Sequence, residues 1–186
     1  RADLFHLPDD KENLTIKIHE LLETYDVMIF SGAVSKGKFD FLPEILDKLG
    51  VKKLFHRVKQ RPGKPFWFGK RDKVAVFAFP GNPVSTCVSC THYFIPWLRK
   101  SLGLQALTQN YAVLDSDFSF KPVLTYFLQV KLVNRKGAIY AIPEAGNGSG
   151  DLANLTLNDA FLVLDAEREN FKKGEVFPYF AYRHFK

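Results

Sequence analysis

Residues 74–85 read VAVFAFPGNPVS, and this stretch predicts a buried strand that turns directly into a helix. Its first half is a continuous apolar run of the kind found in buried strands. Pro83 suits the first helical turn because it has no N–H to satisfy, and we expect a helix from Pro83 to about Leu102. Helix N-termini present free N–H groups to anions, and Ser85 can point a hydroxyl into the same space. The alternative is an ordinary strand-to-helix turn without a ligand.

The residues before this stretch alternate between helical and extended patterns. Apolar spacing, an acidic start and a glycine stop predict helices at residues 9–24 and 40–49 and strands at residues 26–31, 51–59, 66–69 and 74–79. Such alternation is typical of α/β proteins, whose open parallel sheets bind ligands at the carboxyl ends of the strands.

The pattern changes after Gly103 to short strands separated by turns. We expect strands in YAVL, TYFLQVKLV, GAIYAIPE, DAFLVLD and EVFPYFAY, which together predict a small all-β domain, in the form of a barrel. The sequence therefore predicts an α/β domain over residues 1–104 and a β-barrel domain over residues 105–186.

Composition narrows the class of protein. The formal net charge of +6 suits anionic partners, although solubility alone also explains it. Eighteen phenylalanines indicate an aromatic core, and no apolar run is long enough to span a membrane. The N-terminus has no signal-peptide pattern and no starting Met, so we expect a part of a longer protein. Cys87 and Cys90 are too few for a zinc site, and we expect free thiols in a reducing compartment.

The loop SGAVSKGKFD at residues 31–40 follows a predicted strand and precedes a predicted helix. Gly32 and Gly37 allow the backbone to approach a ligand closely, and Ser35 offers a hydroxyl. Asp40 has two interpretations, and its spacing favours the first. It caps the helix that follows, or its carboxylate holds a metal ion for hydrolysis.

The loop RPGKP at residues 61–65 places two cations on either side of a rigid Pro-Gly turn. Arg61 and Lys64 would suit an oxyanion, and a solvated basic turn is the rival interpretation. Taken with the loops at 31–40 and 80–85, this loop predicts one crevice that binds phosphate or another oxyanion.

These three loops resemble the molybdopterin molybdenumtransferase (MoeA) family. The family patterns are close to SGGVSxGxxD, KPGKP and LPGNPVS, and here they read SGAVSKGKFD, RPGKP and FPGNPVS in the same order. The stretch AGNGSGDLANLTLNDAFLVL is similar to a glycine-rich segment of the family's last domain. The resemblance implies the second half of a three-layer, MogA-like α/β domain followed by the family's C-terminal β-barrel, as a fragment of the enzyme.

The resemblance also implies a reaction, in which molybdate is inserted into adenylated molybdopterin with release of AMP and with help from Mg²⁺. It assigns the hydrolytic or metal-binding role to Asp40. The positions implied to bind the pterin substrate are Gly32, Ser35, Gly37, Pro80, Gly81, Asn82 and Ser85. The positions implied to bind molybdate are Arg61, Lys64, Pro65 and Ser149. The sequence departs from the family at Ala33, at Arg61, and at Gln129, where the family has a barrel arginine.

The resemblance implies an anionic pterin and molybdate as partners, a homodimer when full length, and a cytoplasmic location. We expect no nucleic-acid or membrane partner and no activity from the isolated chain. The alternative function is a non-catalytic molybdopterin-binding or scaffold module. Nucleic-acid binding by the aromatic-rich β domain is a third hypothesis, which the clustering of cations in the α/β loops disfavours.

Overall fold

The structure is a computed structural model that describes residues 2–7, 10–32, 41–144 and 152–183. The chain divides into two compact units. The first unit comprises Arg1–Arg57 and Pro65–Gly81, and the second comprises Val58–Lys64 and Asn82–Lys186. The helix that begins at Pro83 belongs to the second unit in this division. The predicted domain boundary between residues 104 and 105 stays a prediction.

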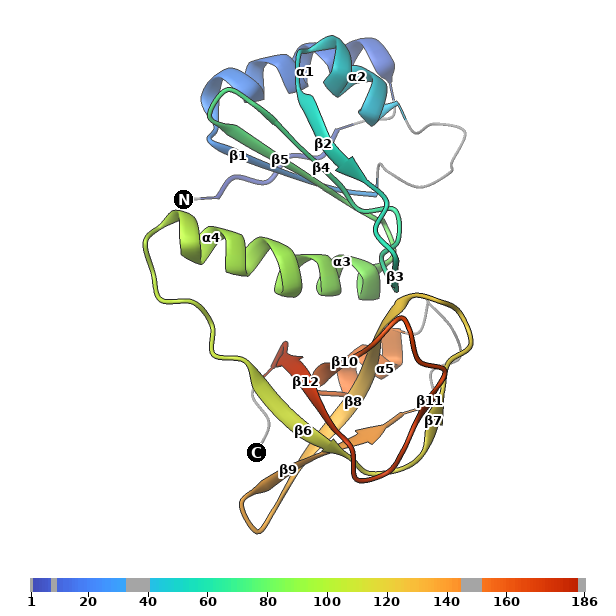
Figure 1. Ribbon diagram of the computed structural model, residues 1–186. Coiled ribbons are helices and arrows are strands. Elements are labelled where there is room, and N and C mark those ends of the chain that lie inside the picture. The colour runs from blue at the N-terminus through green and yellow to red at the C-terminus, as the bar shows by residue number, and fades with distance from the viewer. Residues whose placement is uncertain (1, 8–9, 33–40, 145–151, 184–186) are drawn as a thin grey trace. The chain divides into compact units, whose positions relative to one another are not determined.

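The first unit is a four-stranded sheet with two helices packed on it (Figure 1). Its elements are α1 (Lys11–Thr24), β1 (Val27–Ser31), α2 (Leu42–Lys48), β2 (Lys52–His56), β4 (Trp67–Arg71) and β5 (Val74–Phe79). The strands run in the order β1-β5-β4-β2, with β1 parallel to β5 and the other neighbours antiparallel. The predicted α/β class is confirmed, and β1 and β5 form the parallel pair.

Local signals fix the ends of the two helices. Asp10 caps α1, because its Oδ1 accepts a hydrogen bond from the Asn13 N–H at 2.8 Å. Gly50 follows α2 with a φ of +76°, a left-handed conformation that ends helices and favours glycine. The N-cap position of α2 is Phe41, which makes no side-chain capping bond. Asp40 itself lies outside the described residues.

One face of the sheet packs against α1 and α2. The buried side chains of this cluster come from both helices, from alternate positions of the strands and from Val51, which directly precedes β2: Ile18, Leu21, Leu22, Met28, Leu42, Ile45, Leu46, Val51, Trp67, Val76 and Ala78. The helical residues lie three or four apart and the strand residues two apart, which puts each set on a single face. Removing the apolar surface of these side chains from water is the main stabilising contribution to the unit.

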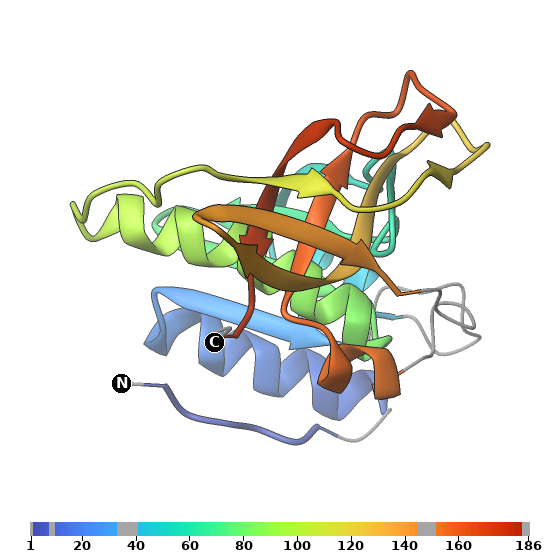
Figure 2. The same cartoon turned by 90° about the horizontal axis from the view of Figure 1, so that it is seen from below.

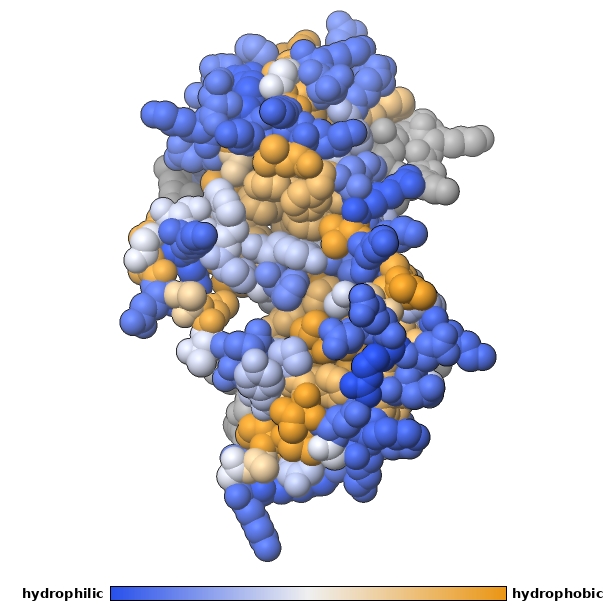
Figure 3. All heavy atoms as spheres, viewed as in Figure 1, coloured by the Kyte–Doolittle hydropathy of each residue, from blue (hydrophilic) through white to orange (hydrophobic). Residues whose placement is uncertain are grey.

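The opposite face of the sheet is lined by phenylalanines that contact one another: Phe55, Phe66, Phe68, Phe77 and Phe79. Phe66, Phe77 and Phe79 are buried, whereas Phe55 is 41% exposed and its neighbour Leu54 is 48% exposed. Figure 3 shows the apolar surface that results over β2 and β4. For the three buried rings, the prediction of an aromatic core is confirmed.

The second unit contains a closed β-barrel. Its elements are β3 (Gln60–Arg61), α3 (Pro83–Ser89), η1 (Cys90–Phe94), α4 (Ile95–Ser101), β6 (Asn110–Leu114), β7 (Phe118–Ser119), β8 (Thr125–Arg135), β9 (Ala138–Pro143), α5 (Leu152–Leu157), β10 (Ala160–Leu164), β11 (Asn170–Phe171) and β12 (Val176–Ala181). The order β10-β12-β6-β9-β8 closes through the pairing of β10 with β8. The strand β3 pairs with the first two residues of β8, Thr125 and Tyr126, which β9 does not reach. The predicted barrel is therefore confirmed. The sequence patterns gave no indication of β3, β7, β11 or α5.

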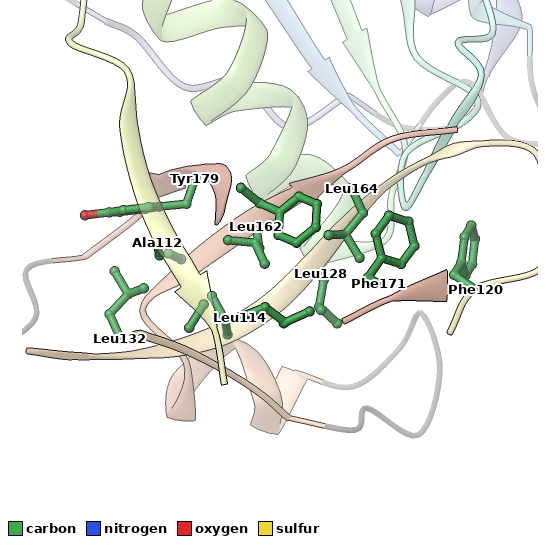
Figure 4. Packing of buried hydrophobic residues seen from close by; sticks show 13 residues of the cluster. Ala112, Leu114, Phe120, Leu128, Leu132, Leu162, Leu164, Phe171 and Tyr179 are labelled. Carbon is green, nitrogen blue, oxygen red and sulfur yellow. The ribbon is translucent and has the colours of Figure 1, made fainter. Parts of the chain in front are cut away.

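The barrel interior is filled by side chains of one parity on each strand (Figure 4). They include Ala112 and Leu114 of β6, Leu128, Val130 and Leu132 of β8, and Ala160, Leu162 and Leu164 of β10. Alternate residues point outward, so Phe127 of β8 and Phe161 of β10 join a second cluster outside the barrel, with Val84 and Val88 of α3. Helix α3 is thereby packed on the barrel wall, beside α5 (Figures 1 and 2).

The predicted helix from Pro83 onward is present as α3, η1 and α4, which form one continuous helix with a π turn in its middle. The Ile95 N–H bonds to the Cys90 carbonyl, five residues back. Pro96 explains the wider turn, because its ring would collide with the His92 carbonyl in a regular α-helix. In the described ranges, no helix combines the length and the apolar character needed to cross a membrane.

Both cysteines of this helix are free and half-buried, as predicted. Burial and the neighbouring Cys90 raise the pKa of the Cys87 thiol to about 11. Burial also raises the pKa of Cys90. Both groups therefore stay protonated at neutral pH, and protonated thiols are poor nucleophiles and poor metal ligands.

Candidate functional site

Eight of the positions predicted for the site fall within the described residues, and four do not. The structure describes Gly32, Arg61, Lys64, Pro65, Pro80, Gly81, Asn82 and Ser85. Ser35, Gly37, Asp40 and Ser149 lie outside the described residues, so their predicted roles stay predictions.

In the first unit, the loop after β1 meets the loop after β5. The parallel pairing brings Ser31 opposite Phe79, so both strands end at the same edge of the sheet. The Gly32 N–H donates to the Phe79 carbonyl at 3.2 Å, and Gly32 has a φ of +98°. A Cβ on Gly81 would lie 3.0 Å from the Gly32 Cα. Glycine at both positions lets the two backbones cross in contact. The structure therefore brings Gly32 and Gly81 together, beside the buried Pro80.

The last four residues of the PGNPVS motif, Asn82 to Ser85, lie in the second unit and form the N-cap and the first turn of α3. Asn82 is the N-cap, and its Oδ1 accepts from the Ser85 N–H at 3.0 Å. The Ser85 hydroxyl donates to the same oxygen at 3.1 Å, and Ser85 is only 5% exposed. Pro83 occupies the first turn as predicted. Helix capping thus explains Asn82 and Ser85 in this structure, and their contact with substrate stays a prediction.

The RPGKP loop forms a tight turn attached to the barrel. The Val58 N–H donates to the Lys64 carbonyl at 2.9 Å and closes the turn. The Thr125 N–H donates to the Lys59 carbonyl at 3.0 Å, and β3 continues parallel to β8. The Arg61-Pro62 peptide bond is cis. Arg61 and Lys64 are both exposed, and Pro65 is partly exposed.

The same turn contacts the long helix, which consists of α3, η1 and α4. A Cβ on Gly63 would lie 3.6 Å from the Ser85 carbonyl oxygen and 3.6 Å from the Ser89 Oγ. Beneath the turn, the Gln60 Nε2 donates to the Pro62 carbonyl at 3.1 Å, and the Gln60 Oε1 accepts from the Tyr93 hydroxyl. The structure therefore brings the RPGKP turn and the first turns of the PGNPVS helix together, as the hypothesis of a shared crevice requires of these two loops.

Arg61 has an aromatic neighbour on the barrel. Its guanidinium carbon lies 5.8 Å from the centre of the Phe120 ring, within the range of a cation–π contact. Phe120 stacks on Tyr126 with centroids 4.3 Å apart and an interplanar angle of 7°. Burial raises the pKa of Tyr126, and the positive charge of Arg61 partly opposes this rise. Among the described residues, no carboxylate oxygen lies within 4.0 Å of the Arg61 or Lys64 side-chain nitrogens.

Sequence reasoning missed the residues that support this turn. Gln60 precedes the motif and Tyr93 lies in the middle of a helix, and neither position carries a local signal of function. Phe120 was included only among the core-filling phenylalanines. Gln129 lies on β8, two residues from Phe127, where its Nε2 is buried. The idea that Gln129 replaces an arginine of an oxyanion pocket stays a prediction.

Comparisons with known proteins agree with the sequence motifs. Residues 2–100 match the family model described as "Probable molybdopterin binding domain", and residues 111–182 match "MoeA C-terminal region (domain IV)". A molybdopterin molybdenumtransferase from Synechocystis is 41% identical over 97% of this chain and 45% of its own length. The molybdenum cofactor synthesis protein cinnamon from Drosophila melanogaster is 31% identical over 92% of this chain and 30% of its own length.

Solved structures give the same assignment. A molybdopterin biosynthesis MoeA protein from Pyrococcus horikosii matches with a TM-score of 0.75 and 26% identity, over 95% of this chain and 42% of that chain. This chain thus spans less than half the length of these relatives. The first family model matches residues 2–100, more than half of the 186 residues, and the second begins soon after it ends. The chain belongs to the molybdopterin molybdenumtransferase (MoeA) family.

Proposed function

We propose that this chain is part of an enzyme that inserts molybdate into adenylated molybdopterin and releases AMP. The observation that carries the proposal is the seating of the Arg61–Lys64 turn on the helix of the PGNPVS motif, with Gly63 against Ser85 and Ser89. Two motifs of the family that lie apart in the sequence are thereby in contact. The turn presents two exposed cations, as a site for a small oxyanion needs.

The chemistry of the two cations suits the substrates. Molybdate is a tetrahedral dianion, and adenylated molybdopterin carries phosphate groups. Arg61 offers a planar fork of N–H donors that can bind two oxygens at once, and Lys64 offers a mobile point charge. In our proposal they bind and orient molybdate together with Pro65 and Ser149. Gly32, Ser35, Gly37, Pro80, Gly81, Asn82 and Ser85 line the path of the pterin and its adenylate.

Asp40 is the residue that we propose to hold Mg²⁺. A magnesium ion would supply positive charge at the phosphates of the adenylate during its cleavage. Within the part of the chain that the structure describes, no three His, Cys, Asp or Glu side chains gather into a metal site. The magnesium assignment therefore depends on Asp40 and its motif. We further propose a homodimer for the full-length protein and a cytoplasmic location, which the free thiols of Cys87 and Cys90 support.

A molybdate-dependent AMP-release assay tests the proposed function. It compares the 186-residue chain with a protein extended to the length of its relatives, each supplied with adenylated molybdopterin, Mg²⁺ and molybdate. We expect AMP release from the extended protein and none from the 186-residue chain, which spans 45% of the Synechocystis relative. Turnover by the short chain would contradict the second expectation. Tight binding of the pterin without turnover by the extended protein would instead support the non-catalytic binding or scaffold module.

A further inference from the structure

We propose that Gln60 and Tyr93 are positioning residues that hold the Arg61–Lys64 turn at a fixed place on the long helix. The proposal rests on the proposed function, because it gives the turn the task of binding molybdate. Neither residue belongs to the motifs that identified the family. Both lie in the second unit, as do the turn and the helix that they join.

Both polar atoms of the Gln60 side chain make hydrogen bonds that support the turn. This side chain is 1% exposed, which is unusual for a glutamine, and buried amides are stable only when hydrogen-bonded. Its Nε2 donates to the Pro62 carbonyl at 3.1 Å, and its Oε1 accepts from the Tyr93 hydroxyl. A carbonyl can only accept, so these partners also determine which end of the amide faces the turn. Burial raises the pKa of Tyr93 to about 12, so the hydroxyl stays protonated and donates at neutral pH.

The space above Gln60 admits only a glycine. A Cβ on Gly63 would lie 2.8 Å from the Gln60 Nε2, closer than real Cβ contacts come. Gly63 also has a φ of +90°, a conformation that other residues rarely adopt. The turn therefore rests against the amide itself, with no side chain between them. The height of Pro62 and Gly63 above the helix is determined by the Gln60 amide and by the Tyr93 hydroxyl below it.

The positions of Arg61 and Lys64 depend on this anchoring because the turn is short and closed. Arg61 precedes Pro62 on the strand β3, which pairs with β8, and its guanidinium lies 5.8 Å from the Phe120 ring. Lys64 closes the turn through its carbonyl, which accepts from Val58. A shift of Pro62 and Gly63 would therefore change the separation of the two cations. Because molybdate is small and rigid, any change in that separation would weaken its binding.

The experiment uses the extended, active protein with three variants. Gln60→Met keeps a long buried side chain but removes both hydrogen bonds, and Tyr93→Phe removes only the hydroxyl. Ser89→Ala is the matched control. Its Oγ lies beside the same turn and is buried, and it has no hydrogen-bond partner among the described residues. The readouts are the KM for molybdate, the KM for adenylated molybdopterin, the Tm, and amide hydrogen exchange of Arg61, Gly63 and Lys64.

We expect Gln60→Met to speed exchange in the turn and to raise the KM for molybdate about tenfold, the scale of losing about one net hydrogen bond. Tyr93→Phe should produce a smaller change in the same direction. In both variants the KM for adenylated molybdopterin should stay within about twofold, because the residues proposed to bind the pterin lie outside the turn. Ser89→Ala should leave both KM values unchanged.

Unchanged exchange in Gln60→Met would overturn the positioning role, whatever the activity. Faster exchange with an unchanged KM for molybdate would overturn the link to oxyanion binding. A parallel rise of both KM values with a lowered Tm would show a general structural role and would also overturn it. Failure of the proposed function gives a different result, the absence of molybdate-dependent AMP release from the unmodified extended protein. The exchange data decide the anchoring of the turn in that case too.

Discussion

At the scale of single residues, Arg61 stands where the family pattern has lysine, and the structure offers a reason. Its guanidinium carbon lies 5.8 Å from the Phe120 ring, which in turn stacks on Tyr126. A planar guanidinium stacks on an aromatic face and still directs N–H groups outward, which an ammonium cannot do. The aromatic pair therefore orients a cation that would otherwise be free in solvent.

We predict that Arg61→Lys weakens molybdate binding although the charge is kept. The loss of an exposed cation–π contact, roughly 0.5–1 kcal/mol, should raise the KM for molybdate about two- to fivefold. Steady-state AMP release at varied molybdate measures it. Arg57→Lys is the matched control, because it makes the same exchange on an exposed arginine four residues earlier. Equal effects of the two substitutions would contradict the role of Phe120.

Residues with a backbone task could be predicted from the sequence, whereas residues with a tertiary task could not. Asn82 and Pro83 follow the rules for helix starts, which depend on neighbours in the chain, and the structure places them at the predicted helix start. Gln60 and Tyr93 are 33 positions apart, and only folding brings them into contact. Ser85 is a different case. Its motif predicts a contact with substrate, and in the structure its hydroxyl donates a hydrogen bond within the helix cap.

At the scale of elements, the long helix is joined to the barrel by an aromatic contact at its π turn. His92 lies in η1, with its ring centre 4.9 Å from that of Phe180, 4.9 Å from that of Phe127 and 4.7 Å from that of Tyr93. Burial lowers the pKa of His92 because the charged form loses its hydration. The imidazole is therefore accommodated as a neutral ring among other rings.

We predict that this packing makes stability depend on pH. The unfolded chain takes up the proton near pH 6.5 while the folded chain resists it, so the free energy of unfolding should fall as the pH drops from about 7.5 to 5.5. Urea denaturation at several pH values measures the slope, and His92→Phe should reduce it. His56→Gln is the comparison. Burial also lowers the pKa of His56, so this substitution measures the part of the slope that comes from the second histidine. A slope that His92→Phe leaves unchanged would contradict the prediction.

The elements that the sequence predicted are those with local patterns. Apolar runs at β1 and β5, the acidic start of α1 and the glycine that follows α2 predicted these elements close to their observed ends. The two-residue strand β3 exists only through its pairing with β8, and the π turn arises from one proline inside an otherwise regular pattern. Neither has enough residues to produce a period of its own.

At the scale of the whole molecule, the net charge is +6, and its cations differ in whether they have a carboxylate partner. Several barrel cations are paired with carboxylates, as in Arg135–Asp115, Arg168–Glu175 and Lys172–Asp117. In the turn, Lys59, Arg61 and Lys64 have no carboxylate oxygen within 4.0 Å among the described residues. Three cations without a carboxylate partner thus lie within six residues of one turn. Such a short cluster suits a small oxyanion, whereas a nucleic-acid backbone needs cations spaced along a groove.

We predict that the chain does not bind DNA or RNA at physiological ionic strength, about 0.15 M. Backbone binding needs many cations along a groove, and each neutralised phosphate adds to a steep salt dependence. Fluorescence anisotropy with labelled single- and double-stranded oligonucleotides measures the affinity as salt is varied. Lys59→Gln with Lys64→Gln provides the comparison, since any residual binding at low salt should weaken with this pair. Saturable binding that persists at physiological salt would instead assign a nucleic-acid function to the aromatic-rich barrel, against the distribution of charge described above.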